Sequence, residues 1–454
     1  MKNGGSWTVA YIPLYATVHD LRAETFTKGY LVRRIVISGL VALAAVLGGV
    51  AVPATAVAGQ PTPAVARPAY QGETNGGEPS ISCVLATDCL GVEGLSSQSD
   101  DGELSIPPRV ARWNGSRWKG VGVTLPKGTK SVDLYGVSCK GAKSCLVVGD
   151  YYTSTSDTAT SHALALSYNG TSLKPLPAVP LPKGTEGVAL TSVSCVTTRY
   201  CVAFGVQSLP LGISEGFDSL IIETWNGAKW TLRTPAGSIG AATVLQPTLV
   251  SCAAVTFCVL AGEALNFSPN SAPETLYLGS WNGKKLTTMK PATVSGKTEL
   301  SPPAGLSCAT ASNCAVTGSE TDPSGSSGVT ALTEIWNGKT WRLGTVTWPK
   351  GDSDSTLGVS CYGAHSCEAV GVDGRGGETA PVDAAAAVLF NGTSGTLQAV
   401  PAPSKGHSTV FAAVSCLPWG DCVAIGQTGK TTTTTPALMT GVWNGKTWKL
   451  YPGF

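Results

Sequence analysis

The chain has few charged side chains and, after residue 58, no long segment with helical periodicity. Only 13% of its 454 residues are charged, and the formal net charge is +2. After position 58, 26 basic residues face 27 acidic ones, so there is no basic stripe of the kind that nucleic acid requires. The chain also lacks an H-E-x-x-H motif, a calcium loop and a phosphate-binding glycine loop. We therefore predict no cofactor, no metal and no nucleic-acid partner.

In place of these motifs, one unit occurs seven times. Each copy has a Ser-Cys pair, a second Cys six positions after the first, and an aromatic-Asn-Gly further along. Successive copies of the first Cys lie 53 to 57 residues apart. All 14 cysteines belong to the pattern, as Cys83/Cys89, Cys139/Cys145, Cys195/Cys201, Cys252/Cys258, Cys308/Cys314, Cys361/Cys367 and Cys416/Cys422.

This period is the length of one four-stranded blade of a β-propeller. Segments such as CVAFGV and SLIIETW are short, β-branched or aromatic, and bounded by turn residues, as strands are. Asn-Gly between two such segments predicts a hairpin with a type I′ turn. The sequence thus predicts an all-β, seven-bladed propeller with four antiparallel strands, A to D, in each blade. We expect the ring to close without strand exchange, by packing between the first and last blades.

Each Cys pair brackets the predicted A–B turn, where partners on neighbouring strands can meet disulfide geometry. On the loop-entropy model such a staple stabilises by roughly 2–2.5 kcal/mol. Zinc binding is the alternative, but zinc sites use closer pairs and four converging ligands. We predict one disulfide per blade. The Ser before the first Cys, for example Ser138, recurs in every unit, and we interpret it as structural.

The N-terminal residues 1–58 have the layout of a signal peptide that begins late. Arg33 and Arg34 precede an apolar run, 35–52, and A-x-A cleavage sites follow at 54–58. Residues 59–77 are rich in Pro, Gly and Ala and indicate a linker, and 78–454 form the propeller. We predict a secreted monomer that folds in an oxidising compartment. An uncleaved membrane anchor is the alternative, since the run nearly spans a bilayer.

The combination of SC-x₅-C-x₃-G with WNG-x-x-W, as in Trp225 to Trp230, resembles repeats in exported β-propeller proteins of high-GC Gram-positive bacteria. This resemblance covers all seven units and implies fold and export, without an activity. The segments 338–341 and 445–448, Gly-Lys-Thr-Trp, are loosely similar to the end of the Asp-box of sialidase-like propellers. The Asp position holds Trp336 and Trp443, so the similarity implies a C–D hairpin and not sialidase chemistry.

The two faces of such a propeller differ. The A–B and C–D turns lie on one face (the turn face), and the variable B–C and D–A connections lie on the other (the loop face). Because function belongs on loops held by a rigid frame, we expect a site on the loop face. Near the end of strand B, five units carry an acid: Glu93, Asp150, Glu263, Glu320 and Asp373.

If these carboxylates converge on the axis, they form a partial ring that could bind a cation or a polyhydroxylated ligand. In unit two, Tyr151 and Tyr152 follow strand B, and Asp133 and Tyr135 enter strand A, a combination that suits a sugar site. The predicted ligand-binding residues are Asp133, Asp150, Tyr151, Tyr152, Glu263, Glu320 and Asp373. The competing interpretation is that they are solvated loop residues.

The sequence favours an exported binding or interaction platform for a cell-envelope glycan or protein. No catalytic set is visible, which argues against an enzyme. The alternative is a polysaccharide-active hydrolase or lyase that uses two carboxylates of the loop face, since glycosidases need two carboxyls about 5–10 Å apart.

Overall fold

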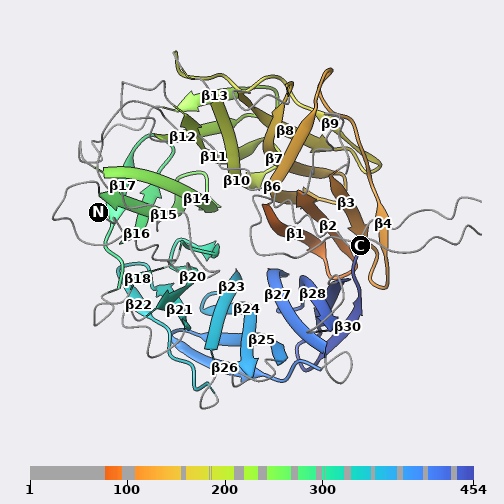
Figure 1. The fold of residues 1–454 in the computed structure, drawn as a ribbon. Helices are drawn as coiled ribbons and strands as arrows, with labels where there is room; N and C mark the ends of the chain where they lie inside the picture. Colours follow the sequence, from red (N-terminus) through yellow and green to blue (C-terminus); the bar gives the residue numbers. More distant parts are fainter. Residues whose placement is uncertain are drawn as a thin grey trace, which may run out of the picture. The chain divides into compact units, whose positions relative to one another are not determined.

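A computed structural model shows a seven-bladed β-propeller (Figure 1). It describes residues 77–454 except 95–107, 155–159, 184, 186, 209–218, 234–242, 267–274, 293–298, 301, 322–328, 349–352, 376–381, 402–406 and 431–436. The predicted signal segment and nearly all of the predicted linker lie outside these ranges. In the described residues, no helix is long and apolar enough to cross a membrane.

Each blade is an antiparallel sheet in chain order, as predicted. Blade 1 comprises β1 (Gly77–Leu85), β2 (Asp88–Gly94), β3 (Arg109–Trp113) and β4 (Trp118–Gly120). Blade 2 comprises β6 (Ser131–Gly141), β7 (Ser144–Tyr152), β8 (Ser161–Tyr168) and β9 (Ser172–Pro175). Blade 3 comprises β10 (Gly187–Thr197), β11 (Tyr200–Ser208), β12 (Ser219–Trp225) and β13 (Trp230–Arg233). Blade 4 comprises β14 (Thr243–Ala254), β15 (Phe257–Asn266), β16 (Thr275–Trp281) and β17 (Leu286–Met289).

Blade 5 differs because its strand A is divided into β18 (Glu299–Leu300) and β19 (Gly305–Thr310). These pair with β20 (Asn313–Thr321), and β21 (Val329–Trp336) and β22 (Trp341–Leu343) follow. Blade 6 comprises β23 (Ser353–Tyr362), β24 (Ser366–Arg375), β25 (Val382–Asn391) and β26 (Ser394–Gln398). Blade 7 comprises β27 (His407–Cys416), β28 (Cys422–Lys430), β29 (Ala437–Trp443) and β30 (Trp448–Pro452). Blade 2 also gains a short fifth strand, β5 (Gly122–Val123), which pairs parallel to β9.

All seven predicted disulfides are present, and no cysteine is free. In each blade the two cysteines are direct cross-strand partners on strands A and B. The bonds are Cys83–Cys89, Cys139–Cys145, Cys195–Cys201, Cys252–Cys258, Cys308–Cys314, Cys361–Cys367 and Cys416–Cys422. The pairing predicted from the spacing is therefore confirmed in every blade. The zinc alternative is wrong, because every thiol is consumed within its own blade.

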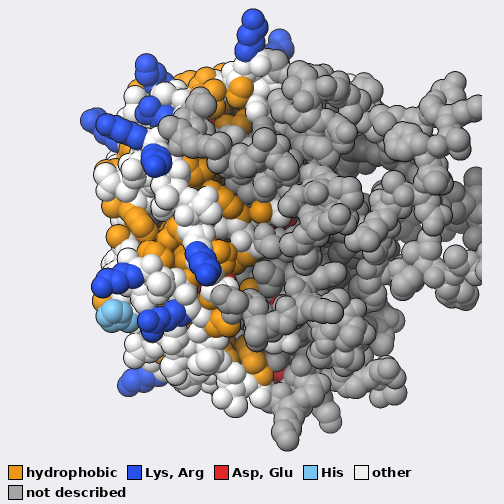
Figure 2. Space-filling model, turned by 90° about the vertical axis from the view of Figure 1, so that its left-hand side faces the viewer, with side chains coloured by type: hydrophobic (Ala, Val, Ile, Leu, Met, Phe, Trp, Pro, Cys, Tyr) orange, Lys and Arg blue, Asp and Glu red, His pale blue; other side chains and the backbone are white. Residues whose placement is uncertain are grey.

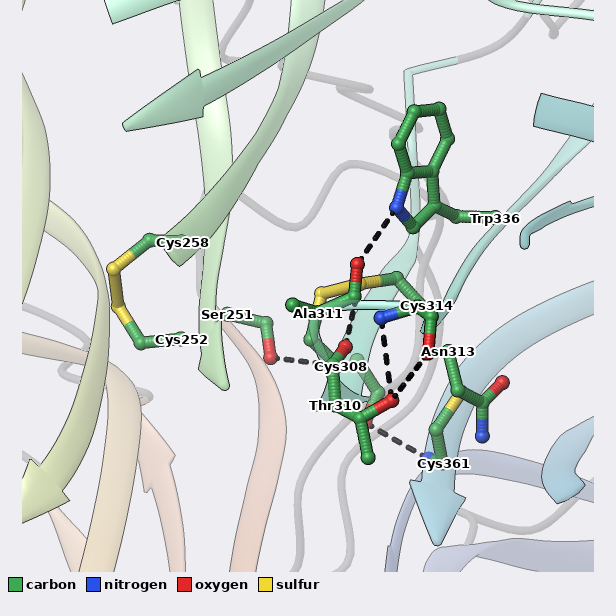
Figure 3. Close-up of a disulfide and its surroundings, with 12 residues drawn as sticks. Ser251, Cys252, Cys258, Cys308, Thr310, Ala311, Asn313, Cys314, Trp336 and Cys361 are labelled. Atoms are coloured by element: carbon green, nitrogen blue, oxygen red, sulfur yellow. Dashed lines mark hydrogen bonds between the residues drawn. A yellow bond between two sulfur atoms is a disulfide. The ribbon is translucent and has the colours of Figure 1, made fainter. Parts of the chain in front are cut away.

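The Ser that precedes each first Cys joins neighbouring blades. Its hydroxyl accepts a hydrogen bond from the backbone N–H of the first Cys in the following blade. Figure 3 shows one such pair, in which Cys308 N donates to Ser251 Oγ at 2.8 Å. The bond recurs at every blade interface: Cys83–Ser415, Cys139–Ser82, Cys195–Ser138, Cys252–Ser194, Cys308–Ser251, Cys361–Ser307 and Cys416–Ser360. The seven bonds form a closed ring through the molecule.

The Gly four residues after the second Cys faces a bulge in strand A. Five blades have a register shift at this point, for example between Leu134 and Gly136 in blade 2. A Cβ on Gly149 would overlap the carbonyl oxygen of Asp133, and one on Gly371 would overlap that of Ser355. Only a glycine lets the two strands approach this closely.

The Asn-Gly segments form the predicted C–D hairpins, but the predicted type I′ turn at Asn-Gly is wrong. Four residues separate Trp113 from its partner Trp118. Asn114 Oδ1 accepts hydrogen bonds from the backbone N–H groups of Ser116 and Arg117, while Gly115 has a φ of 94°. Asn therefore serves as a side-chain acceptor, which its short amide allows, and Gly supplies the left-handed backbone.

The tryptophans of the repeat pack between blades, as predicted. Trp225 and Trp230 lie in a cluster with Leu146 and Val148 of blade 2. At the ring closure, Phe454 packs on Trp118 with ring centroids 4.6 Å apart, and Trp118 Nε1 donates to Thr440 Oγ1. Blade 7 keeps its own strand D, so the ring closes without strand exchange, by packing and hydrogen bonds between the first and last blades.

Candidate functional site

The register of strand B separates the five acids into two groups. Counted from the second Cys, Asp150 and Glu263 are five residues on, Glu93 is four on, and Glu320 and Asp373 are six on. Because side chains alternate across a strand, these two groups point to opposite sides of their sheets. The hydrophobic clusters identify the sides. Residues that share a side with Asp150 pack on blade 3, whereas those that share a side with Asp373 pack on blade 5.

The acids are thus distributed over different blade interfaces. Asp150 is turned toward the interface of blades 2 and 3, Glu263 and Glu320 toward that of blades 4 and 5, and Asp373 toward that of blades 5 and 6. Within the described ranges, no group of three His, Cys, Asp or Glu side chains could hold a metal ion. Glu93 forms a structural ion pair, with Arg109 Nη1 3.1 Å from its Oε2.

In blade 2 the structure brings several predicted residues together. Asp133 on β6 is the direct cross-strand partner of Asp150 on β7, so their carboxyls lie on the same side of the sheet. Tyr135 is the extra residue of the strand A bulge, and its hydroxyl is hydrogen-bonded to Asp150. Tyr152 shares this side and is hydrogen-bonded to both Asp150 and Ser161. We call Asp133, Tyr135, Asp150 and Tyr152 the blade 2 cluster.

The electrostatics of the blade 2 cluster follow from burial. Asp150 is only 2% exposed, while Asp133, Tyr135 and Tyr152 are partly exposed. Burial, followed by repulsion from Asp133, raises the pKa of Asp150 to about 7, against the hydrogen bonds from the two tyrosines. Burial and the two carboxylates also raise the pKa of Tyr135 and of Tyr152, so both phenols stay protonated and donate.

Tyr151 does not join the blade 2 cluster. It points to the other side of β7, where its ring lies 5.1 Å from that of His162 and packs against the core between blades 1 and 2. The alternation of side chains along β7 separates it from Tyr152, although the two are adjacent in sequence.

The structure contains three further buried carboxyls that the sequence analysis did not predict. They are Glu223, Glu334 and Glu368, each at most 1% exposed. Burial raises the pKa of Glu223 to about 8, that of Glu334 to about 7 and that of Glu368 to about 8. Glu334 accepts a hydrogen bond from Ala292 N, and Glu368 accepts one from Gln398 Nε2, whose amide oxygen accepts from Trp448.

A sequence signal for two of them exists. Glu223 and Glu334 stand two residues before the aromatic of aromatic-Asn-Gly, where the other units carry Ala, Leu, Gly or Val. An acid at an otherwise apolar strand position indicates a buried carboxyl.

No protein-family profile and no curated protein matches the chain. Several solved propellers are similar in fold. YCF48 bound to D1 peptide has a TM-score of 0.41 at 13% identity, covering 77% of this chain and 86% of that one. A PL25 ulvan lyase has a TM-score of 0.46 at 8% identity, covering 73% and 83%. The Aleuria aurantia lectin has a TM-score of 0.37 at 10% identity, covering 83% and 95%. These comparisons concern the fold alone.

Proposed function

We propose that the protein is an exported binding protein whose blade 2 cluster engages a glycan. The observation that carries the proposal is the arrangement around Asp150. A nearly inaccessible carboxyl orients the phenols of Tyr135 and Tyr152, while Asp133 beside it stays partly exposed. Carboxylate oxygens accept sugar hydroxyl protons, and phenol rings pack against sugar faces. Export is supported by the seven disulfides, which persist in oxidising compartments.

The burial of Asp150 decides its role in this proposal. A side chain that is 2% exposed does not reach a bound sugar, so Asp150 holds the tyrosines in place. Direct contact falls to Asp133, Tyr135 and Tyr152. A ligand hydroxyl that donates to Asp133 would also reduce its repulsion of Asp150 and so stabilise the complex.

A glycan-array screen of the full chain, followed by calorimetry, tests the proposal. Replacing Asp133 with Asn and Tyr152 with Phe should weaken binding of the selected glycan about tenfold or more, since hydrogen bonds to charged groups contribute about 1.5–3 kcal/mol. The matched control is Asp373→Asn, an acid predicted from the same pattern but turned toward another blade interface. Unchanged affinity in the Asp133/Tyr152 double variant, or a glycan array without any binding, would contradict the proposal.

A hydrolase is the second candidate, because one observation favours it. Asp150, with a pKa near 7, lies beside Asp133, and a protonated acid next to a carboxylate is the pair that glycosidases use. For this function the substrate would have to touch Asp150. Release of reducing ends from a bound polysaccharide, abolished by Asp150→Asn, would establish the hydrolase and displace the binding role.

A further inference from the structure

The turn face carries an accumulation of positive charge that the composition of the chain conceals. Eight exposed cations lie between the strands of the A–B and C–D turns, where the one acid is Asp421. Asp88, which begins β2 at the edge of the blade 1 turn, is ion-paired with Arg112. Figure 2 shows Lys and Arg side chains projecting from this face. The cations are Arg117, Lys143, Arg199, Lys229, Lys284, Lys285, Lys339 and Lys446. The rest of the chain after position 58 holds 18 basic and 26 acidic residues, so the charge is polarised.

The structure places these cations on one surface. The aliphatic stems of Lys143 and Arg199 lie against Gly170 and Gly227, the turn glycines of their own blades. The A–B and C–D turns of a blade are therefore adjacent, as the propeller topology requires. The eight cations come from six of the seven blades, which spreads them around the whole ring.

The same turns expose large apolar side chains. Of the five exposed large hydrophobic residues in the described part of the chain, Val255 and Trp419 lie in A–B turns, and Leu85 is the strand residue that borders one. They belong to blades 1, 4 and 7, and Trp419 is 62% exposed. The Trp419 indole donates to Asp421 Oδ2 at 2.8 Å, which occupies the one acid of these turns.

We propose that the turn face docks on an anionic lipid bilayer. Cations spread over a disc match a planar array of headgroups, whereas a single polymer strand would call for a basic track. A Trp and two aliphatic side chains among those cations are suited to the headgroup boundary, where amphipathic surfaces bury apolar tips. Docking in this way directs the loop face, with its variable connections, away from the membrane.

Vesicle flotation with the full chain tests the proposal. Phosphatidylcholine vesicles with about 30% phosphatidylglycerol are compared with phosphatidylcholine alone, at about 0.05 M and about 0.5 M NaCl. The readout is the ratio of binding to the two vesicle types. The N-terminal apolar run can bind both types and is the same in every variant, so differences in this ratio between variants report the turn face. The wild type should prefer anionic vesicles about tenfold or more at low salt and lose this preference at high salt.

Two matched quadruple variants locate the surface. Changing Lys229, Lys285, Lys339 and Lys446 to Gln should reduce the preference about tenfold or more. The control changes Lys127, Lys130, Lys183 and Lys290 to Gln, exposed lysines of the D–A connections. It alters net charge equally and should keep the preference within about twofold.

Trp419→Ala should reduce the binding that remains at high salt. Equal behaviour of the two quadruple variants, or no preference for anionic vesicles in the wild type, would overturn the proposal. Tight binding of inorganic polyphosphate without vesicle binding would overturn it too, and would identify a soluble polyanion as the partner.

Discussion

The backbone N–H of Cys83 in the first blade donates a 3.0 Å hydrogen bond to Ser415 Oγ in the last blade. The residues are 332 positions apart, and their bond completes the ring of seven Ser–Cys hydrogen bonds. The sequence predicted closure by packing between the first and last blades, with residues 66–72, which lie outside the described residues, as a possible added strand. Closure also uses the same hydrogen bond as every other interface.

Ser415→Ala should destabilise the propeller. The substitution leaves the partly buried N–H of Cys83 without its acceptor, which costs about 1–3 kcal/mol. Urea unfolding measures the loss, and amide exchange at Cys83 should accelerate. Ser116→Ala, in an exposed C–D turn, is the control and should stay within about 0.5 kcal/mol of the wild type. Equal stability of both variants would show that the bond contributes nothing.

Gly371→Ala should prevent or severely impair folding. Its Cβ would overlap the carbonyl oxygen of Ser355, and the two strands would have to separate at the bulge. We expect a loss of about 3 kcal/mol or more, measured by denaturant unfolding or by yield of folded protein. Gly120→Ala is the control, because open space surrounds that position on the outer strand β4. A folded Gly371→Ala protein of normal stability would contradict the bulge.

Glu223→Gln should stabilise the protein at alkaline pH and change little at pH 5. Burial raises the pKa of Glu223 to about 8, from 4.5, so the unfolded state ionises first as pH rises. Its contribution to stability is therefore fully present below about pH 4.5 and is lost as pH rises toward about 8. At pH 9 we expect a gain of about 1–3 kcal/mol, since one pKa unit corresponds to about 1.4 kcal/mol and relaxation removes part of the shift. Thermal unfolding at both pH values measures it, and an equal change at both would refute the assignment.

Removing one disulfide should cost about 2 kcal/mol, because each closes a loop of only a few residues. The variant replaces Cys252 and Cys258 together with Ser, and urea unfolding gives the loss. Mass spectrometry of the unreduced wild type should find 14 hydrogens fewer than the reduced form, in keeping with seven bonds. A cross-blade disulfide in the peptide map would contradict the local pairing.

The repeat period, the Cys spacing and Asn-Gly sufficed to predict the propeller, the four antiparallel strands of each blade and the seven disulfides. Ser415 could be identified as structural because it recurs, but not as a partner of Cys83, since an interface between repeats is invisible within one repeat. The sequence did not predict the side of its sheet to which each acid points. Asp150 and Asp373 look equivalent after their glycines, yet a one-residue offset along strand B turns them to opposite sides.

Tyr135 shows a second limit of prediction from sequence, which is that the position of a β-bulge was not predicted. In an unbulged strand A, Tyr135 would lie on the same side as Asp133 and directly opposite Val148 of strand B. The register shift between Leu134 and Gly136 makes Tyr135 an extra residue, and its contact with Asp150 depends on that local geometry. Bulges follow from the pairing of two strands and cannot be located from one strand alone.

In every repeat the first cysteine has two bonding roles. Its sulfur is bonded within its own blade, and its backbone N–H is bonded to the serine of the preceding blade. Each repeat therefore presents the same connector to the repeat before it and the same acceptor to the repeat after it. Tandem duplication or loss of one repeat in the gene would leave every remaining connector matched. The number of blades could thus change by one repeat at a time during evolution. Because the Ser–Cys hydrogen bonds would fit any number of repeats, the number seven would be set by the geometry of closing the ring.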